Sequence, residues 1–132
     1  MLALRVDPAS RIPPSAQIVA TVLDATCSGE LAVGAKLPSV RVAAVEAMVN
    51  PNTIAKAYRE LEALGVVKAK NGSGVFVSED GLEAAHAMRR EETLVAVRDA
   101  VELARRSGHS MEAVRKVADE VFAEQGTSRR RT

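Results

Sequence analysis

The chain has 132 residues, which suffices for one compact domain with an appendage and excludes two large domains. Hydrophobic residues make up 47% of it, but aromatic residues only 2%, so a core has to be built from many small aliphatic contacts. The net charge of +1 does not indicate a polyanion partner for the whole chain, and its single cysteine excludes an internal disulfide.

The first predicted elements are an extended arm and a helix. Pro8, Pro13 and Pro14 interrupt the start of the chain and favour an extended arm. A helix is predicted from near Ser15 to the break at Ser28-Gly29, because apolar residues recur at helical spacing. These residues are Ile18, Val19, Val22, Leu23 and Thr26.

Two further helices are indicated by their caps. Ser39 is a suitable N-cap for a second helix over residues 41–48. Asn50 and Pro51 fit the N-cap and first position of a third helix, and Gly65 fits its left-handed end. The apolar stripe of this helix consists of Ile54, Ala57, Tyr58, Leu61 and Leu64.

A β-hairpin and two more helices follow. The β-favouring runs VVKAK and VFVS are separated by NGSG and predict a hairpin, and helical periodicity returns from Gly81. The sequence SGHS then separates two amphipathic helices. The predicted fold is mainly α with a small β-hairpin: a winged helix-turn-helix followed by a two-helix tail. We expect the winged domain over residues 8–78, the tail over 79–126 and a disordered basic end over 127–132.

The middle of the chain resembles the GntR family of transcriptional regulators. The resemblance runs through QI (17–18), SGELAVGAKLPSVR (28–41), VNPNTIAKAYRELEALGVV (49–67) and GSGVFV (72–77), in family-like order and spacing. The VNPNT sequence and the short tail are most similar to the YtrA subfamily. The resemblance implies a sequence-specific DNA-binding regulator, a repressor that binds a palindromic operator as a homodimer.

The third helix is the predicted reading element. A recognition helix fits the major groove, and its first turn lies nearest to the bases. Asn52, Thr53 and Lys56 lie off the apolar stripe and therefore point outward. Asn can pair with adenine, Thr can touch a thymine methyl or a phosphate, and Lys can reach guanine or phosphate. Free N–H groups at this helix end add a phosphate site. An ordinary solvated first turn is the alternative.

The resemblance adds contacts on either side of this helix. Arg41 matches an arginine that the family places near the start of the second helix, and the wing tip is implied to reach the minor groove or the DNA backbone. A solvated arginine and ordinary turn glycines are the alternatives. The complete predicted DNA-binding set is Ser39, Arg41, Asn50, Pro51, Asn52, Thr53, Lys56, Lys70, Asn71 and Gly72.

Two positions and the charge of the wing depart from the family pattern. Val42 replaces the usual acidic residue, so one bond of a capping box is lost. Ala55 stands where some relatives carry a base-reading arginine, and the wing is less basic than is common. A weaker electrostatic contribution to DNA affinity is therefore expected.

The two tail helices cannot readily bury both of their apolar stripes alone. We expect them to pack on a second copy, with intramolecular packing as the alternative. The predicted dimerisation residues are Leu94, Val97, Val101, Val114, Val117 and Phe122.

The sequence does not favour an enzyme, a metal site or a cofactor. His86, His109 and Cys27 have no metal-ligand spacing, and Cys27 is expected to be a buried thiol. No apolar run reaches the roughly 20 residues of a membrane span, so we expect a cytoplasmic protein without a membrane partner. The main alternative function is a protein-interaction module with weak or no DNA binding. A small-molecule effector and the operator sequence are not identified.

Overall fold

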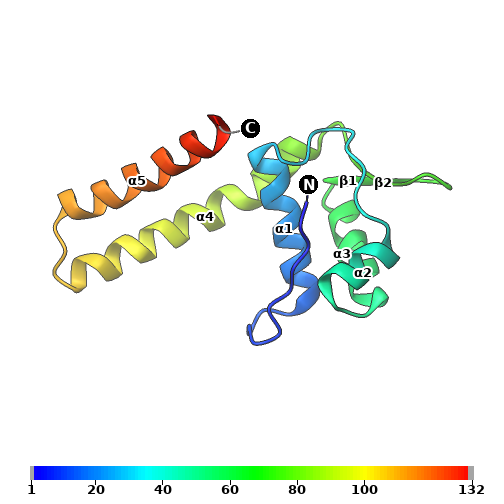
Figure 1. Cartoon of the computed structure of the whole chain (residues 1–132), viewed down its shortest axis with the longest axis horizontal. Coiled ribbons are helices and arrows are strands. Elements are labelled where there is room, and N and C mark those ends of the chain that lie inside the picture. Colours follow the sequence, from blue (N-terminus) through cyan, green and yellow to red (C-terminus); the bar gives the residue numbers. More distant parts are fainter. Residues whose placement is uncertain (1, 131–132) are drawn as a thin grey trace. The chain divides into compact units, whose positions relative to one another are not determined.

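In the computed structural model, residues 2–130 are described, with side chains for residues 2–124. Five helices and one hairpin make up these residues (Figure 1). Their bounds are α1 Pro14–Ser28, α2 Val40–Ala47, α3 Pro51–Ala63, β1 Val67–Lys70, β2 Gly74–Val77, α4 Gly81–Arg106 and α5 Met111–Arg130. This element order confirms the predicted mainly α fold with a small hairpin.

The chain divides into two compact units, Met1–Arg90 and Glu91–Thr132, so the division falls inside α4. The sequence analysis places the boundary at residue 78 instead, and the difference lies in the start of α4. Ala85 is buried in the core of the first unit, and Arg89 pairs with Asp24 of α1 at 2.8 Å. Gly81 also fits closely, because a Cβ there would lie 2.6 Å from the carbonyl oxygen of Val66.

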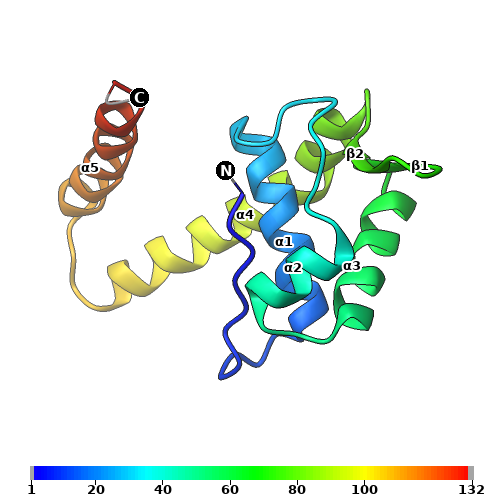
Figure 2. The ribbon, with the colours of Figure 1, turned by 45° about the vertical axis from the view of Figure 1, so that its right-hand side comes forward.

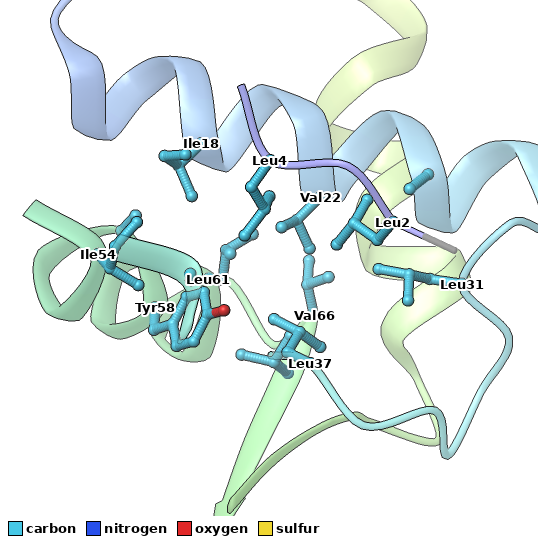
Figure 3. Packing of buried hydrophobic residues seen from close by; sticks show 14 of the residues in the cluster. Leu2, Leu4, Ile18, Val22, Leu31, Leu37, Ile54, Tyr58, Leu61 and Val66 are labelled. Carbon is cyan, nitrogen blue, oxygen red and sulfur yellow. The ribbon is translucent and has the colours of Figure 1, made fainter. Parts of the chain in front are cut away.

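The core of the first unit lies between α1, α3 and the base of the hairpin (Figures 2 and 3). Its helical side chains come from the faces that the helical periodicity predicts, and others come from the N-terminal arm, the segment before α2 and the residue before β1. The largest fully buried ones are Leu4, Ile18, Val22, Leu37, Ile54, Leu61 and Val66. The small residues Ala43, Ala44 and Ala47 let α2 pack closely on this core.

The N-terminal arm belongs to this core, which the predicted domain start at residue 8 does not include. Leu4 is fully buried beside Ile18 and Val22 (Figure 3), and Leu2 is also buried. The backbone N–H of Leu4 donates to Oε1 of Glu46 at 3.1 Å, which ties the arm to α2. The arm is therefore extended, as predicted, but it is packed on the fold.

The second unit has no buried side chain among residues 91–124. It contains the end of α4 and all of α5, joined at the predicted break, where Gly108 has φ +89° and Ser110 Oγ accepts from the N–H of Ala113. Residues 127–132, expected to be disordered, are helical up to Arg130, and their side chains and residues 131–132 lie outside the described part. None of the helices described here is long and apolar enough to span a lipid bilayer.

Candidate nucleic-acid interface

The N-terminus of α3 is capped as predicted. Oδ1 of Asn50 accepts from the N–H of Asn52 at 2.8 Å, and Pro51 occupies the first helical turn. Asn50 therefore uses its acceptor to hold the helix end, while its two amide N–H donors point to no partner within the described residues. Pro51 has no polar side-chain group, so it can contribute only shape to a binding surface.

The buried stripe of α3 orients its polar face outward. Ile54, Tyr58 and Leu61 are buried, whereas Asn52 and Lys56 are exposed. Thr53 is half-buried at the edge of this face. The outward side of α3 therefore carries the amide of Asn52, which can both donate and accept hydrogen bonds, followed by the ammonium group of Lys56.

Arg59 belongs to the same exposed face, and the sequence analysis did not include it. It lies three residues after Lys56 and seven after Asn52, and these spacings place the three side chains on one side of a helix. Within the described residues, neither Lys56 nor Arg59 forms an ion pair. Extending the helical spacing beyond the first turn would have found Arg59.

The start of α2 supplies the second part of the candidate interface. Oγ of Ser39 accepts from the N–H of Val42 at 3.2 Å, which is the predicted N-cap. Arg41 is exposed in the first turn. Val42 is also exposed, and its side chain provides no reciprocal cap to the backbone of Ser39.

A buried hydroxyl fixes the start of α2 against α3. Oη of Tyr58 donates to the carbonyl oxygen of Pro38 at 2.7 Å, one residue before the cap Ser39. Burial, and to a smaller extent the carboxylate of Glu46, raises the pKa of Tyr58 from 10.0 to about 12. The Tyr58 hydroxyl therefore keeps its proton, and with it this hydrogen bond, well above neutral pH. The bond places the start of α2 next to the second turn of α3.

Replacing Tyr58 with Phe is expected to lower stability by about 0.5–1.5 kcal/mol, because the carbonyl of Pro38 loses its donor. The wild type should also lose stability between pH 10 and about 12, since the unfolded tyrosine ionises before the folded one. Tyr58→Phe should lack this component. Chemical unfolding at several pH values measures both effects. Because Tyr58 is the single tyrosine, phenolate absorbance reports its ionisation directly, and a folded-state pKa near 10 would contradict the prediction.

The wing is a hairpin with a third, one-residue partner. Lys68 pairs with Phe76 across β1 and β2, and Lys36 pairs with Phe76 from the other side. The N–H of Leu37 donates to the carbonyl of Val75 at 2.8 Å, which holds this segment against β2. The sequence analysis predicts no strand between the break at Ser28-Gly29 and the cap Ser39, because one bridging residue gives too short a pattern.

The turn of the wing lies at the end of the hairpin that extends from the helices (Figure 1). Asn71 and Gly72 are exposed there, and Gly72 has φ +73°, a backbone conformation that favours glycine. Lys70 is exposed, and its Nζ lies 4.9 Å from the centre of the Phe76 ring. The described structure thus places Ser39 next to α3. The predicted wing residues Lys70, Asn71 and Gly72 lie at the end of the hairpin instead.

Residues 14–77 match the model of the family described as bacterial regulatory proteins, gntR family. The chain is also 39% identical over 90 residues to the HTH-type transcriptional regulator Rv1152 of Mycobacterium tuberculosis, covering 67% of this chain and 74% of that protein. The chain belongs to the GntR family. This confirms the family resemblance found in the sequence.

This GntR chain is also similar to YtrA of Bacillus subtilis, an HTH-type transcriptional repressor, with 39% identity over 77 residues. The match covers 58% of this chain and 59% of YtrA, so the chain spans less than two thirds of that relative. The names of these relatives describe transcriptional regulators, which are not enzymes, in agreement with the prediction from sequence.

Two solved structures extend the comparison of this GntR chain. A GntR family transcriptional regulator from Listeria monocytogenes matches 87% of this chain and 98% of its own, with a TM-score of 0.69 and 25% identity. The AraR DNA-binding domain, solved in complex with operator ORX1, matches 57% of this chain and 93% of its own, with a TM-score of 0.52 and 26% identity. The match to the Listeria regulator confirms the five-helix architecture with a winged unit. The match to AraR is to a DNA-binding domain whose structure was solved with operator DNA bound.

The predicted tail residues lie in the second unit. Val97, Val101, Val114 and Val117 line an apolar trough of 710 Å³ along the end of α4 and the start of α5. Leu94 and Phe122 are exposed outside this trough, and Phe122 is 74% exposed.

Among the described residues, no group of three His, Cys, Asp or Glu could hold a metal ion. Cys27 is half-buried, and burial together with Asp24 raises the pKa of its thiol.

Proposed function

We propose that this chain binds duplex DNA in a sequence-specific manner and regulates transcription, acting as a repressor at a palindromic operator. The observation that carries the proposal is the exposed face of α3, on which Asn52, Lys56 and Arg59 follow a capped helix N-terminus. Such a face combines a base-pairing amide with two cations at the position where a recognition helix enters the major groove. The AraR domain, similar in fold, was solved with its operator.

The residues at the start of α2 and along α3 have separate roles in this proposed function. Asn52 reads a base edge, and Lys56 reads a base or a phosphate. Arg41 and Arg59 neutralise phosphates, as do the free backbone N–H groups at the start of α3. Ser39, Asn50 and Pro51 hold the helix ends that present these groups, since the side-chain oxygens of Ser39 and Asn50 already accept capping bonds. Thr53 contributes a methyl or hydroxyl contact at the edge of the face.

We further propose that two copies bind together through the second unit. Residues 91–124 contain no buried side chain, although their exposed face includes Leu94, Val101 and Phe122. A helical unit without a core does not remain folded on propensity alone, so a second copy that covers the trough supplies the missing burial. Two-fold pairing also places two recognition helices about one helical turn apart on a palindrome. The protein is proposed to act in the cytoplasm, where its DNA partner is found.

The proposal is tested by selecting bound sequences from random duplexes with the full-length protein. An inverted repeat with half-sites about one helical turn apart is expected. Asn52→Ala should lower affinity for the selected duplex by about 1–3 kcal/mol and relax the preference at one position of each half-site. Arg41→Ala should lower affinity for all duplexes and reduce the salt slope by about 0.9 for each phosphate that is no longer neutralised.

Lys116→Ala provides the control, because Lys116 is an exposed lysine of α5 outside the first unit. It should leave the sequence preference unchanged. Enrichment of no sequence, with binding to every duplex absent, would overturn DNA binding and favour a protein-interaction module. Selection of a site whose affinity is unaffected by both Asn52→Ala and Arg41→Ala would overturn the assigned surface.

A further inference from the structure

The outer face of the wing carries a basic cluster that the family resemblance did not include as a whole. Strand alternation directs Val67 and Val77 toward the core, so Lys68 and Phe76 face outward with Lys70. Lys36 joins them from the third segment, as the bridge partner of Phe76. The cluster is defined here as Lys36, Lys68 and Lys70 around Phe76, and Lys36 and Lys68 were absent from the predicted DNA-binding set.

Two of these lysines are held in place by their neighbours. The stem of Lys36 crosses Gly74, where an added Cβ would lie only 2.8 Å from Cε of Lys36. Gly74 is the register partner of Lys70, so the stem of Lys36 passes beside the strand position of Lys70. Lys70 itself lies over the Phe76 ring, at 4.9 Å from its centre. The fold therefore directs like charges to one small surface, an arrangement that an anion would stabilise.

The neighbouring acidic groups form no ion pair with these lysines in the described residues. Glu79 and Asp80 line the same hollow as Lys68 and Lys70, at its edge after β2. In the part of the chain that the structure describes, none of the three lysines forms an ion pair with them or with any other carboxylate. Three ammonium groups thus remain available to a partner.

We propose that the outer face of the wing binds backbone phosphates of duplex DNA beyond the operator half-site, through Lys36, Lys68 and Lys70. This inference rests on the proposed function, and it assigns the wing a second surface besides its turn. A phosphate backbone suits the cluster because ammonium groups act as point charges without base specificity. The surface extends the contacted length of DNA and compensates for a wing turn, Asn71 to Ser73, that carries no charge.

The test compares two duplexes that contain the selected operator. One ends at the half-sites, and the other has about ten further base pairs, roughly one helical turn, on each side. The wild type is expected to bind the longer duplex more tightly. The Lys36→Gln/Lys68→Gln double variant should lose this gain, on the order of tenfold at 0.1 M salt for each phosphate that the variant leaves unbound. Its salt slope should fall by about 0.9 per phosphate, while its selected sequence stays the same.

Lys116→Gln removes one positive charge from the second unit and is the net-charge control for Lys68→Gln alone. Thermal unfolding of both variants checks that the fold is intact, and Lys68→Gln alone serves if the double variant is destabilised. Unchanged affinity and salt slope in a folded Lys68→Gln variant, with normal operator binding, would overturn the wing surface alone. Failure of the wild type to bind any selected duplex would instead overturn the proposed function.

Discussion

Replacing Val101 with Asp is expected to convert the proposed dimer into a monomer. Val101 lines the apolar trough of the second unit, and a carboxylate there would have to be desolvated against the apolar partner surface. A monomer engages only one half-site, so operator affinity should fall by about 10²- to 10⁴-fold, because linked binding raises the effective concentration of the second recognition helix. Sedimentation and band-shift titrations measure the two effects.

The matched control is Val95→Asp. Val95 is 50% exposed on α4, does not line the trough and lies on the opposite side of the helix from Val101 and Val97. The same substitution there should leave the dimer and the operator affinity unchanged. A Val101→Asp protein that remains dimeric would contradict the proposed interface.

Replacing Leu4 with Ala is expected to destabilise the first unit by about 2–5 kcal/mol. The side chain of Leu4 is fully buried against α1, so its truncation removes apolar packing and leaves a cavity. For a unit of this size, such a change would lower the melting temperature by roughly 4–8 °C for each kcal/mol. Chemical unfolding followed by circular dichroism measures the difference.

Arg5→Ala serves as the neighbouring control, because Arg5 is exposed in the same arm and Leu4 is not. Only a small change, within about 0.5 kcal/mol, is expected for it. If Leu4→Ala unfolds at the same denaturant concentration as the wild type, the arm does not belong to the cooperative core.

The sequence predicts the first unit well where several local signals agree. At the start of α3, the cap Asn50, the first-turn Pro51 and the buried Ile54 and Tyr58 all favour the same helix, and the structure has that helix. The hairpin is also predicted to within one residue at each strand end, since its two β-favouring runs have a clear turn between them.

The features that the sequence analysis misses depend on contacts between distant residues. The arm residue Leu4 donates to Glu46, and Lys36 pairs with Phe76, yet neither pair produces a periodic pattern along the chain. The salt bridge from Arg89 to Asp24 similarly extends the first unit past the predicted boundary. Local propensity and periodicity contain no information about such pairings.

Within the candidate interface, the sequence predicts some features that the structure confirms and others that stay predictions. Asn52 and Lys56 were predicted because a buried stripe determines the exposed side of a helix, and they are exposed. Ser39 and Asn50 were predicted as helix N-caps, and their side-chain oxygens accept the capping bonds in the structure. Their contribution to DNA binding stays a prediction, as do those of Arg41 and the wing turn.

The absence of a buried side chain from residues 91 to 124 has a thermodynamic consequence for the proposed dimer. The first unit contains its own core, so its melting temperature should not depend on how much protein is present. The second unit would owe its order to association, and mass action would then make its melting temperature rise with protein concentration. Dilution alone would thus unfold one end of the chain while the other end remains native.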